Sequence, residues 1–212
     1  MKKLIGDVFS DADEYMDFIF EIVRRHIIHP DRVVVYNFLE DTSVPLDSKD
    51  NRPNEIINDT LAAFSTISEK YIQVIRSGAD DRFPPETDGV LEIYMKNIEK
   101  ELEYESIYPG LTILDRLKII LIHECRHAQQ FFYILDKFHD RNLYNKMVRY
   151  DNLTFRKDPH KYLDCILESD AELYAKYAVT KKKTRSVAGT FKLDKVMSYL
   201  ITKMAKEGYC YE

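Results

Sequence analysis

The feature that most constrains the fold of this 212-residue chain is a pair of histidines four positions apart within a predicted helix. His123 and His127 belong to the run His-Glu-Cys-Arg-His, which has the HExxH pattern. The four residues before it, 119–122, are apolar, and a Pro-Gly pair breaks the chain upstream, so we expect one long helix over 112–137. Residues four apart lie one turn above each other, so both imidazoles lie on one face.

This arrangement suits a metal site. Two imidazoles on one helix face can converge on a single zinc ion at about 2.0–2.1 Å each. Glu124 follows the first histidine and can reach a water on the same ion without binding the ion itself, which is the position of a general base. The alternative is a pair of core histidines that satisfy each other or nearby carboxylates.

A catalytic zinc site needs a third protein ligand and one open position. Metzincins would have Gly at 130 and His at 133, whereas this chain has Gln130 and Tyr133, so that class is excluded. His139 lies three turns further along the predicted helix and points elsewhere unless the helix breaks. The downstream run ILESDAELYAKYA offers a better ligand.

Two glutamates in that run, Glu168 and Glu172, are four apart and therefore share a helix face. Ala171 and Ala175 give the same helix a face of small residues, which allows close approach to the HExxH helix. A short carboxylate side chain needs that closeness to reach the metal. Apolar neighbours on both sides favour this packed helix over the alternative, a solvent-exposed acidic turn.

HExxH followed by Glu-x-x-Ala-Glu-x-x-Ala resembles the gluzincin division of the zinc metallopeptidases. The resemblance covers about 60 residues, and the chain is also similar to an uncharacterised zincin-like family from Bacillus. It implies that Glu168 is the third zinc ligand and that Glu172, where several relatives have Asp or Asn, supports a zinc-binding histidine. It further implies that an edge strand before the active helix binds an extended peptide, and 90–95 is the candidate strand.

These observations predict a zinc-dependent hydrolase that acts as a peptidase on a peptide or protein substrate. Zinc held by His123, His127 and Glu168 would lower the pKa of its water to about 7. Glu124 would take the proton of that water and pass it to the leaving amine. The developing oxyanion needs a further donor. The candidate donors are Arg126, His160, Tyr162 and Tyr174.

Two other functions stay open at this stage. One is a non-catalytic zincin-like module that holds metal for structure or regulation. The other keeps the scaffold without zinc and uses the basic run at 181–185 to contact a partner. A structural site does not need Glu124 and usually closes zinc with four protein ligands, so the three visible ligands favour catalysis.

The order of predicted elements indicates an α+β domain of the zincin-like kind, in which a small mixed or antiparallel sheet packs against the HExxH helix. Residues 1–108 supply a helix and the sheet, and 109–212 supply the helical part with the metal site, within a single domain. The expected elements are a helix from Asp11 to Pro30, strands at 33–38, 60–67, 71–76 and 90–95, a helix at 96–106, the HExxH helix, a polar connection to Pro159, a helix from there to Thr180, and a helix from its cap Thr190 to Gly208. For 60–67 and 71–76, parts of one helix are the alternative to two strands.

Composition narrows the function classes further. The net charge of −5 argues against a nucleic-acid binder, because phosphate contacts need clustered Lys and Arg. Three cysteines without a CxxC pair indicate reduced thiols rather than a disulfide framework. The longest apolar run has four residues, and the N-terminus lacks the apolar region of a signal peptide. We therefore expect a cytoplasmic protein outside the membrane, of undetermined oligomeric state.

Overall fold

The structure is a computed structural model that describes residues 8–38, 60–79, 82–103, 108–157, 164–182, 186 and 188–209. Within these ranges the chain forms seven α-helices and one small three-stranded sheet, which confirms the predicted α+β class. The elements are α2 (Ala12–His26), β1 (Val33–Phe38), β2 (Ala62–Thr66), α4 (Glu69–Arg76), β3 (Gly89–Tyr94), α5 (Met95–Glu103), α6 (Ile113–Phe138), α7 (Arg141–Lys157), α8 (Ile166–Thr180) and α9 (Leu193–Lys206).

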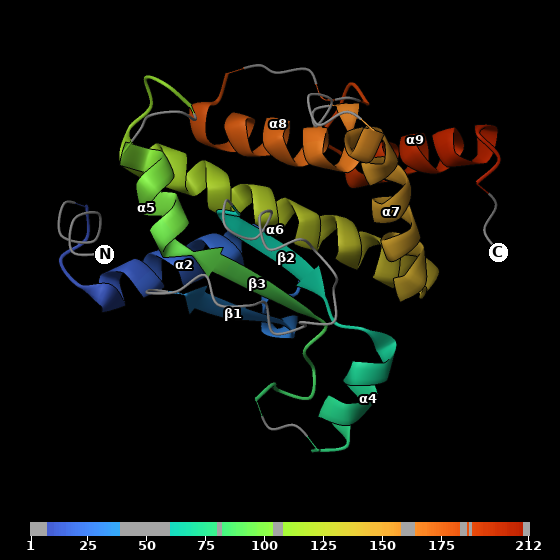
Figure 1. Ribbon diagram of the computed structural model, residues 1–212, viewed down its shortest axis with the longest axis horizontal. Coiled ribbons are helices and arrows are strands. Elements are labelled where there is room, and N and C mark those ends of the chain that lie inside the picture. The colour runs from blue at the N-terminus through green and yellow to red at the C-terminus, as the bar shows by residue number, and fades with distance from the viewer. Residues whose placement is uncertain are drawn as a thin grey trace.

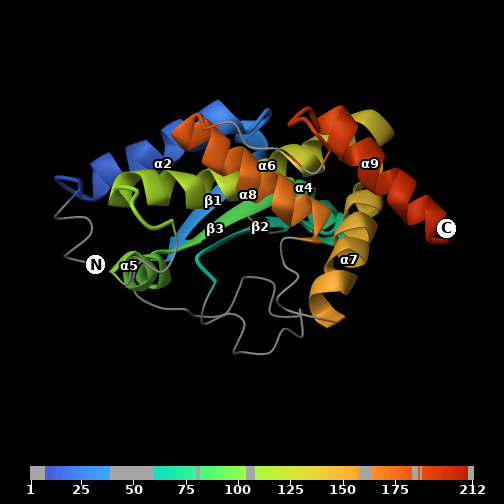
Figure 2. The ribbon, with the colours of Figure 1, turned by 90° about the horizontal axis from the view of Figure 1, so that it is seen from above.

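The predicted HExxH helix is α6, the longest element, which lies between the sheet and α8 (Figure 1). It begins where Thr112 accepts a hydrogen bond from the amide of Asp115 at 3.1 Å, and it ends at His139, whose backbone is left-handed with φ 53°. Apolar side chains are buried on several of its faces, as expected of a helix that runs through the interior. α5 and α7 lie near its two ends (Figure 2).

The sheet has the strand order β1-β3-β2, with β1 parallel and β2 antiparallel to β3, so it is mixed. The prediction that 90–95 forms an edge strand is wrong, because β3 is the central strand. Every residue of β3 is buried, which is typical of a strand with neighbours on both sides. In the described part of the chain, β2 is the strand that lies beside α6 and pairs with another strand on one side only.

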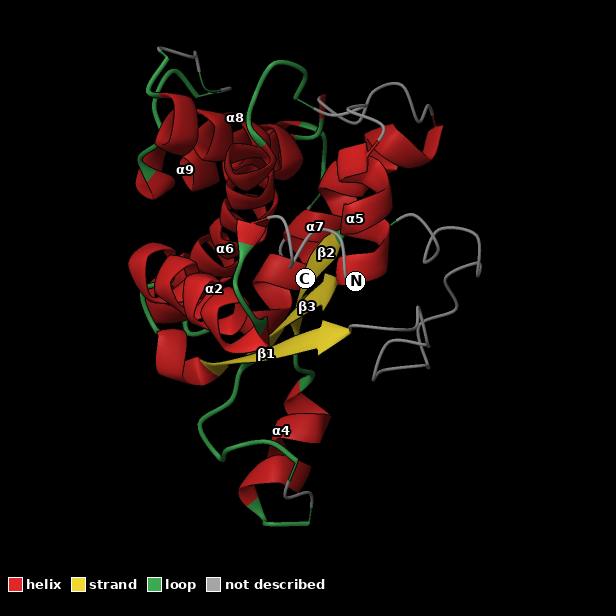
Figure 3. Ribbon diagram, turned by 90° about the vertical axis from the view of Figure 1, so that its left-hand side faces the viewer, coloured by secondary structure: helices red, strands yellow, loops and turns green. Residues whose placement is uncertain are grey.

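Residues 71–76, predicted as a strand, are the helix α4 instead. Ser68 caps this helix by accepting a hydrogen bond from the amide of Tyr71. Ile72 and Ile75 are buried, and their spacing of three places them on one face of a helix. They form a small second core with Ile67, Phe83 and Val90, and Figure 3 shows α4 extending away from the other helices.

The predicted polar connection before Pro159 is also wrong over most of its length, because it contains the 17-residue helix α7. Asp140 accepts a hydrogen bond from the amide of Leu143 at 3.1 Å, as a capping residue does. Leu143, Tyr144 and Met147 lie on one helical face and are buried. This face packs α7 against the main core, beside the end of α6.

The remaining helices differ from prediction mainly at their ends. Asp11 caps α2 as predicted by accepting a hydrogen bond from the amide of Glu14 at 2.9 Å. α8 begins at Ile166, and Pro159, predicted to start it, lies outside the described residues. Thr190 does not cap the last helix, because α9 begins at Leu193 and the side chain of Thr190 accepts a hydrogen bond from the amide of Lys192 instead.

The sheet is fixed to α6 through aromatic packing. The ring of Phe64 in β2 packs against Phe131 in α6, with their centroids 5.9 Å apart. The same ring covers Gly89 so closely that a Cβ atom there would lie 2.6 Å from it, so a side chain at this position would push the ring away.

Cys125 and Cys165 are buried, and neither forms a disulfide bond. The helices of the described part fall short of the length and apolarity required to span a membrane.

Candidate metal centre

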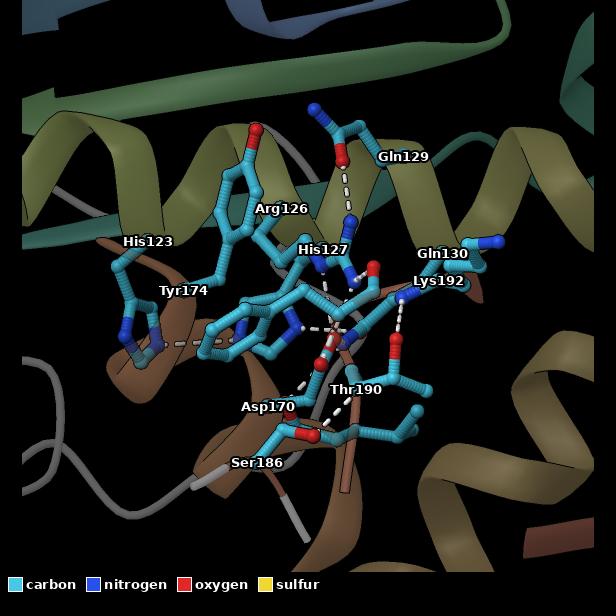
Figure 4. Close-up of polar contacts among 12 residues, drawn as sticks. His123, Arg126, His127, Gln129, Gln130, Asp170, Tyr174, Ser186, Thr190 and Lys192 are labelled. Atoms are coloured by element: carbon cyan, nitrogen blue, oxygen red, sulfur yellow. Dashed lines mark hydrogen bonds and ion pairs between the residues drawn. The ribbon is translucent and has the colours of Figure 1, made fainter. Parts of the chain in front are cut away.

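Three predicted ligand atoms converge between α6 and α8. His123 Nε2 and His127 Nε2 lie 3.1 Å apart, and Glu168 Oε2 lies 3.3 Å from each of them. The helices run antiparallel, so one turn of α8 faces one turn of α6. Ala171 and Ala175 are completely buried at this contact, which agrees with the close approach expected from small residues. Figure 4 shows the two imidazole rings directed toward each other.

The spacing of these atoms fits a tetrahedral zinc site. Ligands at about 2.0–2.1 Å from a tetrahedral ion lie about 3.3 Å from one another. The triangle formed by the two nitrogens and the carboxylate oxygen has edges of 3.1–3.3 Å. Among the described residues these three are the group whose side chains could hold a metal ion. The donor set of two imidazoles and one carboxylate suits a catalytic zinc, which keeps its fourth position open.

The other ring nitrogens of both histidines face oxygen acceptors. His127 Nδ1 lies 3.0 Å from Gln130 Oε1, and the amide nitrogen of Gln130 donates to the Leu167 carbonyl and to Asp170, which fixes the orientation of the amide. His123 Nδ1 lies 3.4 Å from Glu172 Oε2. A proton on each Nδ1 leaves each Nε2 with a free lone pair directed at the centre.

Glu172 is itself held in place by two further side chains. The hydroxyl of Tyr108 donates to Glu172 Oε2 at 2.7 Å, and Lys176 Nζ lies 2.9 Å from Oε1. This is the position expected for a carboxylate that supports a zinc-binding histidine, and the longer glutamate side chain still reaches the ring. Tyr108 was not predicted from the sequence.

Glu124 lies beside the three ligand atoms but is not itself one of the candidate metal ligands. Its Oε2 accepts a hydrogen bond from the backbone amide of Phe64 in β2 at 2.8 Å. Its Oε1 lies 4.0 Å from His123 Nε2. The carboxylate is thus fixed at one oxygen by the sheet, while the other oxygen lies near the position that a metal ligand would occupy.

Burial and charge shift the titration of these groups in the metal-free protein. Burial lowers the pKa of His123, but its hydrogen bonds with Glu168 and Glu172 and the charge of Glu124 outweigh burial and raise that pKa to about 10. Burial would raise the pKa of Glu168, but the two imidazoles hold it well below its ordinary value. The hydrogen bonds accepted by Glu172 likewise outweigh burial and lower its pKa to about 2. The pKa of Glu124 is raised, chiefly by burial.

Two of the predicted oxyanion donors are engaged elsewhere. Arg126 pairs with Asp170 through Nε at 2.7 Å and donates to the carbonyl of Phe191, so its guanidinium is already satisfied (Figure 4). The ring of Tyr174 lies 4.4 Å from that guanidinium, and its hydroxyl faces His26 at 3.4 Å. These two residues therefore build a structural cluster behind the centre. His160 and Tyr162 lie outside the described residues.

Sequence reasoning missed three residues that border the centre. Besides Tyr108, these are Phe64, whose amide holds Glu124, and Tyr144, whose hydroxyl donates to the carbonyl of His127 at 3.3 Å. The signal for Tyr144 was the helical spacing of apolar residues in α7. Phe64 carried no signal, because its backbone amide makes the contact and any residue except proline supplies one.

Comparison of the chain with models of protein families found no match. Comparisons with curated proteins and with solved structures found none either. What the centre can do is therefore inferred from its own geometry and from the resemblance of its motifs.

Proposed function

We propose that the protein is a zinc-dependent hydrolase that cleaves peptide bonds. The observation that carries this proposal is the convergence of His123, His127 and Glu168 beside a fourth residue, Glu124, that the sheet holds close to them. Three protein ligands leave one coordination position for water or substrate, as in catalytic zinc sites. A site that held zinc for structure alone would need no such glutamate.

Zinc held by His123, His127 and Glu168 would supply an acidified water and would polarise the carbonyl group of a substrate. Glu124 acts as the general base. Its Oε2 is held by the amide of Phe64, so Oε1 accepts the proton of the attacking water and later donates it to the leaving nitrogen. Burial raises the pKa of this carboxyl above its ordinary value, which helps it to hold the proton before passing it to the leaving nitrogen.

In this proposal the substrate pairs with β2. The sequence analysis assigned peptide binding to residues 90–95, but these belong mainly to β3, the central strand. The carbonyl of Leu61 bonds to the amide of Tyr94, so alternate residues of β2 face the sheet. Ala62, Phe64 and Thr66 therefore direct their backbone groups to the outer edge, where Phe64 meets Glu124. An extended peptide that pairs with this edge passes beside the metal centre. This arrangement favours a peptide over a compact substrate.

The proposal is tested by measuring zinc content and hydrolysis in parallel. We expect about one zinc per chain by elemental mass spectrometry in protein purified without chelator. Glu168→Ala should lose this zinc. Glu124→Gln should keep it and lower the cleavage of an N-acetylated peptide library by roughly 10²- to 10⁴-fold. Glu21→Gln, an exposed change on α2, is the matched control and should alter neither quantity.

Three outcomes would contradict parts of this proposal. Wild-type protein that takes up no zinc after reconstitution would exclude the metal centre. Zinc retained in Glu168→Ala would move the third ligand to another residue. Zinc without any hydrolysis would leave the second function, a zincin-like module that binds metal without turnover.

A further inference from the structure

Arg116 is a buried cation for which the described residues provide no counterion. Only 2% of the surface of Arg116 is exposed. Its Nε and Nη1 atoms have no hydrogen-bond partner in the described part of the chain. A guanidinium cannot lose its charge, because its pKa exceeds 12. Burying such a group without a partner is costly, so an anion is expected to complete it.

Two other buried arginines are each paired with a buried carboxylate. Arg126 pairs with Asp170, and Arg141 pairs with Asp88. Both carboxylates are themselves buried, so each cation is neutralised by the fold. No such pair is found for Arg116 among the described residues.

Two acidic groups already have other partners: Asp115, the neighbour of Arg116 in sequence, and Glu172, which faces the same side of α6 from α8. Asp115 belongs to the cap of α6 and accepts a hydrogen bond from the hydroxyl of Thr112 at 2.8 Å. Glu172 faces His123 and is bound by Lys176. The positive end of the α6 dipole adds to the charge of Arg116, because the residue lies in the first turns of the helix.

Arg116 also lies on the face of α6 that carries the metal centre. It precedes His123 by seven residues, nearly two helical turns, so the two side chains leave the helix in almost the same direction. The distance along the helix is about 10.5 Å. The side of α6 that carries the metal centre therefore also carries, nearer the start of the helix, a charge of the opposite sign to a carboxylate.

We propose that Arg116 binds a carboxylate of the substrate and so restricts cleavage to bonds near that group. This inference rests on the proposed function and adds its specificity. An extended peptide covers about 10 Å with three residues, so a carboxylate on Arg116 places a bond within about three residues of it at the metal centre. The free C-terminus of a peptide supplies such a carboxylate, and so does an acidic side chain at a fixed distance from the cleaved bond.

A pair of peptide libraries distinguishes these sources. The libraries are N-acetylated and randomised, and they differ only in a C-terminal carboxylate or a C-terminal amide. Preference for the acid, with cleavage within three residues of its end, would assign the C-terminus. Equal cleavage of both, confined to bonds at a fixed distance from Asp or Glu, would assign a side chain. Cleavage indifferent to either carboxylate would overturn the proposal.

Arg116→Met removes the charge and keeps much of the side-chain volume. We expect it to lower kcat/KM for the preferred library roughly 10- to 100-fold, chiefly through KM, and to leave cleavage of carboxylate-free peptides unchanged. Arg116→Lys should restore part of the loss. Lys118→Met, which removes a charge from the opposite face of α6, is the matched control. Equal loss on all peptides in Arg116→Met would overturn the proposal.

A binding measurement keeps this test separate from hydrolysis. Zinc-loaded Glu124→Gln protein is heated with N-acetylated tripeptide pools that end in a carboxylate or an amide, and with pools that carry or lack Asp and Glu. A carboxylate-bearing pool should raise the unfolding midpoint, and adding Arg116→Met should abolish the rise. Equal midpoints with all pools would overturn the carboxylate site. Failure of hydrolysis alone would instead overturn the proposed function.

Discussion

Helices α6 and α8 enclose two neighbouring polar clusters that differ in how their charges are balanced. The arginine cluster consists of Arg126, Gln129 and Asp170. The metal cluster consists of His123, His127, Glu168 and Glu172. Gln130 lies between them and bonds to both, through His127 on one side and Asp170 on the other.

The arginine cluster is complete within the protein. Arg126 donates to Asp170, to Gln129 Oε1 at 2.7 Å and to the carbonyl of Phe191 at 2.7 Å. In the metal cluster, two ring nitrogens and a carboxylate oxygen instead face one another at 3.1–3.3 Å. Such a set needs a proton or a cation at its middle. The difference is that the fold itself satisfies the arginine cluster, whereas the side chains of the metal cluster are placed so that they could hold a metal ion.

The largest effect should come from breaking the arginine cluster. Asp170→Asn leaves Arg126 buried with a neutral partner and should lower the free energy of unfolding of the metal-free protein by about 3–5 kcal/mol. Urea unfolding of metal-free protein measures this change. Glu168→Ala is the comparison variant and should lower it less, because the two imidazoles that it leaves behind can lose their charge, whereas the guanidinium of Arg126 cannot. Equal losses in both variants would erase the contrast between the clusters.

A smaller effect is expected within the metal cluster when its outer support is removed. Glu172→Gln weakens the interaction that orients His123, so the affinity for zinc should fall about 10- to 100-fold. Competition with a chromogenic chelator measures the dissociation constant. Glu21→Gln, which removes an exposed carboxylate, should leave the affinity unchanged. An unchanged affinity in Glu172→Gln would mean that the histidine is oriented by the fold alone.

The smallest expected effect is the change in zinc affinity over a single pH unit. Zinc binds deprotonated imidazole, and the pKa of His123 is raised to about 10, so zinc must displace a proton below that pH. Affinity should therefore rise about tenfold per unit between pH 7 and 9 for one displaced proton. An unperturbed histidine would predict a plateau above pH 7, so a plateau there would count against the raised pKa.

The same shift fixes the sign of the stability change in the metal-free protein. A pKa that is higher in the folded than in the unfolded state stabilises the fold below the ordinary value of 6.5. That contribution is lost as the pH rises from 6.5 toward 10. The metal-free protein should become less stable over this window while zinc binding becomes tighter. Urea unfolding at pH 6.5 and 9 measures the change.

Local sequence patterns predicted the parts of the site that lie on single helices. The phase of HExxH placed His123 and His127 on one face of α6, and the spacing of Glu168 and Glu172 placed both on one face of α8. These features depend on residues within four positions of each other, which is the range over which helix geometry acts.

Patterns that fit two periodicities were misread. The segment 71–76 is rich in β-branched residues, which favoured a strand, yet Ile72 and Ile75 are three apart and mark a helix face. In α7, several asparagines and charged residues hid a buried stripe that contains Tyr144 and Met147. Both stripes were present in the sequence, but propensity was weighed above spacing.

Contacts between residues that are far apart in the sequence could not be predicted. The contact between Phe64 and Glu124 joins positions 60 apart, and that between Tyr108 and Glu172 joins positions 64 apart. Nothing local in either segment encodes such a pairing. The same holds for Arg126, whose place in the HExxH motif suggested a role at the metal but whose side chain is directed by Asp170 on the neighbouring helix.

The separation of the ligands along the chain has a consequence for degradation. Glu168 lies 41 positions after His127, and the 17-residue helix α7 lies within the interval. An ion that joins these two side chains closes a long loop, and such clips stabilise by restricting the open chain. Digestion by trypsin within α7 should therefore slow when zinc is bound and speed up when it is withdrawn. The rate at which tryptic fragments of α7 appear would then report the fraction of protein that holds metal, and no substrate is needed for this measurement.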